Sequence, residues 1–369
     1  MKTTEKTLWV IAILGFLAGL VGLYSRITGG HLVAAYNTYV PWGLWIAVYV
    51  TLIGASVGAF LVAALGYGFG VMAIRPLGRI ALLTALAALI AGMTTVWLDL
   101  GRPERLLSLF FSTSSTSVMG WMTWFYLIFG ILLVVMLVLD WIRPQSAVLR
   151  WLGWLGLAFI ILFGGAEGSL FGVVGARAMW DSGLTPILFL VEGALTGVAL
   201  VLLLSILFGE HTPLPFLRNL AIALICAVIV LEASEYFTAF YADIPAKVAS
   251  IRIVLFGPYW WVFWIAHLGL GLLIPLILLA STRNNATLLG IAGALIALMA
   301  ITTKLNLVIP ALTVPEFEGL RTAYVGPGLS LNYFPTATEW LVAIWTVSLA
   351  VVIFLIGYRF LSTRKQVQA

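Results

Sequence analysis

The chain has 369 residues, of which 63% are hydrophobic and only 9% are charged, and its formal net charge at pH 7 is +5. An ordinary soluble domain has about 25% charged residues, so the composition excludes a soluble globular protein and indicates an integral membrane protein. The excess of basic residues does not indicate nucleic-acid binding, because in a membrane chain these residues chiefly report topology.

Apolar runs long enough to span a bilayer recur along the whole chain. A hydrocarbon core of about 30 Å requires about 20 helical residues. Runs of this kind lie near 8–24, 42–69, 79–98, 118–140, 152–174, 185–208, 218–237, 258–280, 286–309 and 338–360. The first run follows Lys2 and Lys6, as in a signal peptide, but no clear small-residue cleavage site follows it. We therefore predict an all-α integral membrane fold with about ten transmembrane helices.

Loop charges predict the orientation. With ten spans both termini lie on one face, and the loops there carry 11 of the 19 basic residues, namely Lys2, Lys6, Arg75, Arg79, Arg143, Arg150, Arg218, Arg283, Arg359, Arg364 and Lys365. The other eight, including Lys304, are assigned to the opposite face. The positive-inside rule places both termini in the cytoplasm. The longer loops, near 25–41, 99–117, 238–257 and 310–337, then face outward, where we expect any docking surface.

The residues that bind redox metals are scarce. The chain has three His and one Cys, whereas haem and iron–sulfur sites need paired histidines or clustered cysteines. His31 and His211 lie in or near predicted loops, which leaves His267 as the single histidine inside a predicted helix. Cys226 alone cannot hold a cluster. We therefore expect this chain to bind no haem, iron–sulfur cluster or other metal.

Four acids lie inside predicted helices: Glu167, Glu192, Glu232 and Glu235. A charge at the centre of a bilayer costs about 3 kcal/mol or more, so such residues usually face a protein or water interior and mark ion or proton pathways. Glu232 and Glu235 are three residues apart and share a helix face. We interpret the acids as proton carriers that His267 can join. The alternative is that each acid, and His267, is simply satisfied by a neighbouring helix, or that Glu235 lies at the membrane interface.

Two short patterns concern helix packing and a charged loop. "IGASVGA" at 53–59 and "EGALTGV" at 192–198 share a G-A-x-x-G pattern, which is compatible with two four-helix bundles related by duplication. Glycines at this spacing let helices approach closely in lipid. In "LDLGRPERLL" at 98–107, Asp99 ends a predicted helix and is followed by Arg102, Glu104 and Arg105. This compact charged cluster is suited to closing a pocket or binding a partner.

Longer motifs resemble the NrfD-like family, the membrane subunits of polysulfide reductase and related respiratory complexes, including those of periplasmic uptake hydrogenases. The resemblance covers nearly the whole chain. It rests on "VPWGLWIAVYVTLIGASVGAF" at 40–60, "WLDLGRPER" at 97–105, "GSLFGVVGARAMWDSGLTPILFLVEGALTG" at 168–197, "KLNLVIPALTVPE" at 304–316 and "YFPTATEWLV" at 333–342. The ten spans are similar to the longer branch of the family.

The resemblance implies an organisation and a location. Residues 42–175 would form a first four-helix bundle with a quinone site, and 176–309 a second bundle with a possible proton path. Residues 1–41 and 310–369 would each supply a flanking helix and a periplasmic loop. The resemblance further implies a multi-pass protein of a bacterial or archaeal cytoplasmic membrane. Its partners would be a periplasmic ferredoxin-like iron–sulfur subunit and a further redox subunit of molybdopterin, hydrogenase or multihaem type.

The family resemblance also directs attention to individual residues. The quinone, menaquinone or ubiquinone, would contact Tyr49, Glu167, Asp99, Arg102 and Trp42. Glu167 departs from the family pattern, which often has His at that position. A quinone needs an apolar slot with polar groups at its carbonyls; Tyr49 can donate a hydrogen bond and Glu167 can exchange a proton. Glu192, Glu232, Glu235 and His267 would form a proton path in the second bundle.

The sequence favours a membrane subunit that exchanges electrons between the quinone pool and a periplasmic iron–sulfur subunit, with possible proton translocation. It would not be catalytic alone. Two alternatives remain open at this point: a secondary transporter or ion channel that uses the same carboxylates, and a membrane anchor that assembles a complex without binding quinone.

Overall fold

The computed structural model describes residues 3–210, 213–315, 319–323 and 326–367. Within this part of the chain, ten helical segments are long and apolar enough to cross a membrane. They correspond to the ten predicted spans, so the expected all-α, multi-pass membrane fold is confirmed.

The described elements, in chain order, are α1 Thr3–Gly29, η1 Gly30–Val33, α2 Leu44–Tyr67, η2 Arg75–Leu77, α3 Gly78–Asp99, η3 Pro103–Arg105, α4 Ser108–Phe111, α5 Val118–Ile142, α6 Ala147–Gly172, α7 Thr185–Phe208, α8 Leu214–Ala242, α9 Pro245–Phe256, η4 Val262–Leu273, α10 Ile274–Ser281, α11 Ala286–Thr313, α12 Leu320–Ala323 and α13 Ala337–Val367. The eighth span combines η4, a stretch with π-helical hydrogen bonding, with α10. Pro275 at the start of α10 has no amide hydrogen for the usual i to i−4 bond, which favours this change of register.

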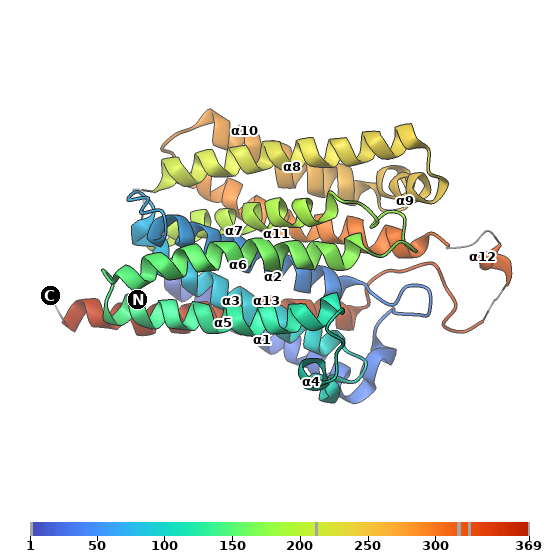
Figure 1. Ribbon diagram of the computed structural model, residues 1–369, viewed down its shortest axis with the longest axis horizontal. Helices are drawn as coiled ribbons and strands as arrows, with labels where there is room; N and C mark the ends of the chain where they lie inside the picture. The colour runs from blue at the N-terminus through green and yellow to red at the C-terminus, as the bar shows by residue number, and fades with distance from the viewer. Residues whose placement is uncertain (1–2, 211–212, 316–318, 324–325, 368–369) are drawn as a thin grey trace.

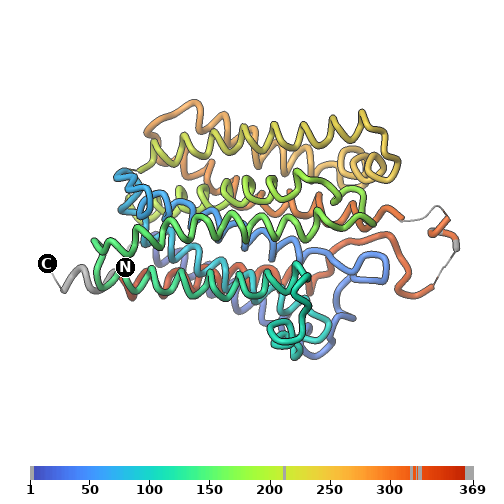
Figure 2. The backbone as a smooth tube through the Cα atoms, viewed as in Figure 1, coloured from blue at the N-terminus to red at the C-terminus, as the bar shows by residue number. Residues whose placement is uncertain are grey.

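The long helices run along one common direction (Figures 1 and 2). The start of α1 and the end of α13 lie at one end of the molecule, which we call the terminal face. The short helices α4, α9 and α12 lie at the opposite end, which we call the loop face (Figure 1). The longer connections are therefore all on the loop face, and the connection near 238–257 contains a helix, α9, where the sequence predicted only a loop.

Contacts between the helices arrange them around two centres. Helices α2, α3, α5 and α6 pack around one, while α7, α8, α11 and the η4–α10 span pack around the other. The two groups meet through α2 and α7, and α1 packs with α13, which in turn covers α3. The residue boundaries of the two bundles stay a prediction.

The G-A-x-x-G stretches form the contact between α2 and α7. A Cβ atom added to Gly54 would lie 3.1 Å from the Cα of Gly193, and one added to Gly193 would lie 3.0 Å from the Cα of Gly54. One turn further on, a Cβ on Gly197 would collide with the backbone of Gly58. Both helices run from the loop face to the terminal face, so matching positions of the two patterns face each other across the seam. Small residues at this spacing allow the backbones to touch.

One expectation about this fold was wrong. Lys304 was assigned to the outward loops, but α11 continues to Thr313 and buries Lys304, which is 5% exposed. The helix can hold this cation because the ammonium group forms an ion pair with Glu192 of α7.

A single methyl group at the glycine seam should separate the helices. We expect Gly197→Ala to lower the free energy of unfolding by about 1 to 3 kcal/mol, because the added carbon has no space beside Gly58. Gly165→Ala is the matched control, since a Cβ atom there meets nothing within 4 Å. Thermal unfolding of the purified protein in lipid nanodiscs checks this, and equal midpoints for the two variants would rule out a tight seam.

Candidate functional site

A cavity of about 830 Å³ lies among α2, α3, α5 and α6, and it extends from the loop-face ends of these helices. Most of its lining is apolar. The polar side chains are Tyr49, Thr94, Asp99, Thr123 and Tyr126, together with the indoles of Trp42 and Trp97. Residues 103–111 contribute Leu106, Leu109 and Phe110 and cover the loop-face end. Ligand pockets commonly combine an apolar lining with a few placed polar groups in this way.

Two tyrosines form the polar centre of the cavity. Tyr49 of α2 and Tyr126 of α5 are 5% and 8% exposed, and their hydroxyl groups form a hydrogen bond in which either can be the donor. Tyr126 is held edge-on against Phe163, with ring centroids 4.9 Å apart. Because one shared bond uses only one of the two hydroxyl hydrogens, the other can be donated to a ligand.

Asp99 brings a carboxyl group to the loop-face end of the same cavity. It is 8% exposed, and the Tyr36 hydroxyl donates to its Oδ1 at 2.8 Å. Burial raises the pKa of Tyr36 well above its ordinary value, and the charge of Asp99 adds to this rise. The phenol therefore stays protonated and remains a donor. Arg26 fixes the end of α3 by donating to the carbonyls of Leu98, at 2.7 Å, and Leu100, at 2.8 Å.

A second network anchors the chain segment that leads into α2. Glu339 at the start of α13 is fully buried and accepts hydrogen bonds from the backbone N–H groups of Ala35 and Thr336, both at 2.9 Å. The Tyr333 hydroxyl also donates to Glu339 and accepts from the N–H of Leu44 at 2.8 Å. Burial raises the pKa of Tyr333, and Glu339 raises it further, so this phenol also stays neutral. These bonds hold the 34–43 segment, and with it Trp42, over the cavity.

The structure brings three of the five predicted quinone-contact residues to the cavity wall: Trp42, Tyr49 and Asp99. Trp42 stacks on Trp180 with ring centroids 5.7 Å apart. Arg102 is instead exposed on the loop face and does not line the cavity. Glu167 is also outside the lining, although it is close enough to act electrostatically on both cavity tyrosines.

Glu167 occupies an unusual position on α6. Its side chain is 2% exposed, and its Oε1 has no hydrogen-bond partner in the described part of the chain. Lys304 acts on it electrostatically from the neighbouring group of helices. A buried carboxyl without a partner is costly, so this residue is well placed to hold or exchange a proton.

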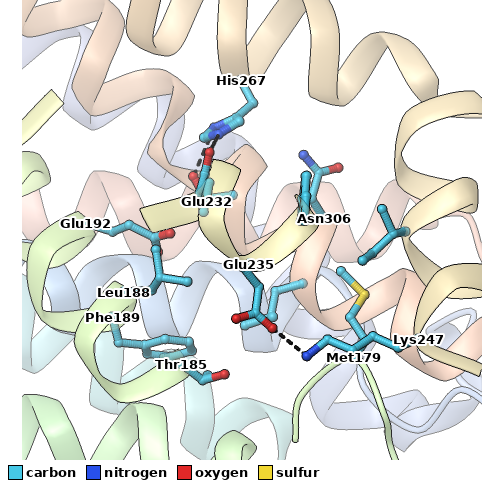
Figure 3. A pocket seen from close by; sticks show the side chains of 14 residues that line it. Met179, Thr185, Leu188, Phe189, Glu192, Glu232, Glu235, Lys247, His267 and Asn306 are labelled. Atoms are coloured by element: carbon cyan, nitrogen blue, oxygen red, sulfur yellow. Dashed lines mark hydrogen bonds and ion pairs between the residues drawn. The ribbon is translucent and has the colours of Figure 1, made fainter. Parts of the chain in front are cut away.

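The remaining predicted residues meet in a second, polar region among α7, α8, α9, η4 and α11 (Figure 3). Glu192, Glu232, Glu235 and His267 all line one cavity of about 60 Å³. A neighbouring cavity of about 30 Å³ shares Glu192 and His267 with it. Each space exceeds the roughly 10 to 15 Å³ that one water molecule needs.

Each acid of this polar region is paired with one base. Glu235 contacts Lys247 at 2.5 Å, Glu232 contacts Nε2 of His267 at 2.9 Å, and Glu192 pairs with Lys304. Figure 3 shows the first two pairs, each joined by a dashed line. We call these six residues the paired acid cluster. Their side chains are 4% to 14% exposed, so the charges are largely removed from solvent.

Hydrogen-bonding groups extend the paired acid cluster. Ser182 donates to Glu235 at 2.8 Å, and Thr303 lies 3.1 Å from Nδ1 of His267. Since His267 contacts an acid at one ring nitrogen and a hydroxyl at the other, both of its nitrogens have a partner through which a proton can pass.

Helix α2 lines both the large cavity and the polar region. Tyr49 lines the large apolar cavity, whereas Val50, Thr51 and Gly54 of the same helix line the small polar cavity beside Glu192 and Lys304. The polar residues of both regions lie in the loop-face half of the molecule, within about ten residues of the helix ends at that face.

Three important partners were not among the predicted site residues. Tyr126 lies in an aromatic run that also fits an interfacial belt. Lys304 could have been identified as a lone cation inside the apolar run 286–309. Lys247 lies in a segment predicted to be a loop, and nothing in its sequence context indicates a buried acid partner. Among the described residues, no group of three or more His, Cys, Asp or Glu side chains could hold a metal ion.

Comparison with known proteins gives a consistent set of relatives. The sequence model of the family described as polysulphide reductase, NrfD, matches residues 32–316. The chain is 32% identical to a selenate reductase subunit of Mesobacillus selenatarsenatis, over 93% of this chain and 91% of the relative. It is 26% identical to the Hdr-like menaquinol oxidoreductase integral membrane subunit of Archaeoglobus fulgidus, over 95% of this chain and 90% of the relative. It is 27% identical to protein NrfD of Escherichia coli, over 64% and 83% respectively.

Proposed function

Because the chain belongs to the polysulphide reductase NrfD family, as its motifs predicted, we propose that it is the quinone-binding membrane subunit of a multi-subunit oxidoreductase. It exchanges electrons between a menaquinone or ubiquinone pool and a periplasmic ferredoxin-like iron–sulfur subunit. A further redox subunit of molybdopterin, hydrogenase or multihaem type completes the complex. The names of the relatives, which include a menaquinol oxidoreductase and a selenate reductase, support this class of complex.

The observation that carries the proposal is the large cavity with its Tyr49–Tyr126 pair. Its lining fits a quinone, since it is apolar along most of its wall and has hydroxyl donors and one carboxyl group near its loop-face end. Trp42, Tyr49, Tyr126 and Asp99 would hold the head group. A bound quinol supplies two electrons and two protons, and Asp99 offers an oxygen that can accept a proton.

Proton movement is the second part of the proposal. Glu167 interacts electrostatically with the cavity tyrosine Tyr126 and with Lys304 of the second group of helices. We therefore assign it the exchange of a proton between the cavity and that second group. From there the paired acid cluster leads to the loop face, where Lys247 belongs to the short helix α9. We assign Glu192, Glu232, Glu235 and His267 to this path, with Lys304 and Lys247 as their counter-charges.

The orientation of the protein follows from the same proposal. The loop face is the periplasmic side and both termini are cytoplasmic, as the distribution of basic residues in the loops favours. The polar region and the quinone cavity are then both close to the periplasmic surface, where an iron–sulfur partner can accept electrons.

The tyrosine pair provides the direct test. We expect Tyr49→Phe and Tyr126→Phe each to lower kcat/KM for quinol oxidation by about tenfold in the assembled complex, because each breaks the Tyr49–Tyr126 hydrogen bond that orients the hydroxyl donating to the head group. The double variant should lower kcat/KM by more than the product of the two single reductions, since in each single variant the remaining hydroxyl can partly replace the missing one. Tyr24→Phe, on an exposed tyrosine of α1, is the matched control. Wild-type kinetics in the double variant would refute the assignment.

The proton path is tested at its least disruptive position. Glu232→Gln keeps the shape and hydrogen bonding of the side chain, and His267 can remain as a neutral imidazole beside it. In vesicles containing the complex, we expect fewer protons released at the loop face per electron, while uncoupled quinol oxidation continues. Glu104→Gln, at an exposed acid, is the control. An unchanged proton yield in the Glu232 variant would remove the cluster from the path.

A further inference from the structure

The large cavity is much longer than a quinone ring. Along α3 its lining extends from Leu86 to Asp99, thirteen residues apart, which corresponds to about 20 Å of helix. Along α5 it extends from Met119 to Val135, sixteen residues apart, or about 24 Å. The cavity therefore follows the seam between α3 and α5 from the loop face toward the middle of the molecule.

The two halves of this seam differ in chemistry. The polar side chains on its walls are all in the loop-face half, where α3 contributes Thr94 and Asp99 and α5 contributes Thr123 and Tyr126. The half toward the terminal face is apolar, and its lining residues are Leu86, Leu89, Ile90, Leu127, Gly130, Ile131, Val134 and Val135. A molecule with one polar end and one long apolar end matches this division in one orientation only.

The apolar half opens toward the lipid. Ile90 on α3 is 39% exposed, while Ile131 and Val134 on α5 are 55% and 47% exposed, on the outer surface of a membrane-spanning region. The loop-face end is instead covered by residues 103–111, whose apolar side chains belong to the cavity wall. A ligand can therefore enter laterally from the lipid, and residues 103–111 close the loop-face end of the cavity that it reaches.

We propose that the apolar half of the α3–α5 seam, from Leu86 to Val135, is the entry route and binding groove for the prenyl tail of the quinone. This inference rests on the proposed function and specifies its ligand. The head group lies toward Tyr49 and Asp99, the tail leaves between α3 and α5 near the bilayer centre, and the chain favours long-tailed quinones over tail-less ones.

Gly130 controls the width of this groove. It is the one lining residue of α5 without a side chain, and a Cβ atom there would lie 3.5 Å from Cδ2 of Leu89 across the seam. This is an ordinary van der Waals distance, so alanine fits, whereas a larger side chain must occupy the space between the two helices. Gly130 is therefore a determinant of tail binding that does not touch the polar end.

The test compares two ligands on the purified full-length chain in lipid nanodiscs. One is a naphthoquinone with a tail of several prenyl units, and the other is the same ring with a methyl group in place of the tail. We expect Gly130→Phe to weaken binding of the tailed quinone by about tenfold or more and to leave the tail-less ring bound as in the wild type. Gly130→Ala should bind both as the wild type does.

Two further variants serve as a second test and as a control. Ile90→Trp narrows the opposite wall from an exposed position, so it tests the groove even if Gly130→Phe fails to fold. Ile128→Trp adds the same bulk on α5 at an exposed residue outside the lining, and it should change nothing. Equal losses for both ligands, or no loss for either, would overturn the tail groove. If the wild type bound neither ligand, the proposed function itself would be overturned.

Discussion

The close approach of α2 and α7 is the constraint on which the arrangement of both functional regions depends. Gly54 and Gly58 of one helix meet Gly193 and Gly197 of the other, so that backbone touches backbone. In lipid, where apolar side chains gain little by leaving the solvent, such contact is a main source of helix association. Helix α2 therefore contributes to both regions, with Tyr49 on the side of the large cavity and Thr51 on the side of Glu192 and Lys304.

The two groups of helices use related positions for different chemistry. Gly54 and Gly193 are 139 residues apart, and the same spacing separates Tyr49 from Leu188 and Glu167 from Asn306. Leu188 and Asn306 both line the 60 Å³ polar cavity. This correspondence is compatible with duplication of one bundle. One copy has an open, largely apolar cavity. In the other, the space is reduced to water-sized cavities whose acids each have a basic partner, as buried charges require.

Patterns within one helix were predictable from the sequence, while pairings between helices were not. Length and hydropathy identified the ten spans, and the cost of a buried charge singled out Glu192, Glu232, Glu235 and His267, which meet in one region. The two lysine partners, Lys304 of Glu192 and Lys247 of Glu235, were missed because Lys304 was assigned to an outward loop and Lys247 lies in a segment predicted to be a loop. The Tyr49–Tyr126 bond joins residues 77 positions apart, and no periodicity in a single sequence specifies such a contact. Arg102 shows the converse, since a charge next to a site in sequence can still point to solvent.

A transporter would account for the acids but not for a long apolar cavity with a polar end, and a simple anchor would account for neither. The most direct measurement is photoaffinity labelling of the complex in native membranes with an azido-quinone, followed by peptide mapping. Quinone binding in the large cavity predicts label on the loop-face ends of α3 and α5, around Asp99 and Met119 to Tyr126, that unlabelled quinone displaces. Displaceable label confined to α7, α8 or α11 would contradict the assignment of the quinone site.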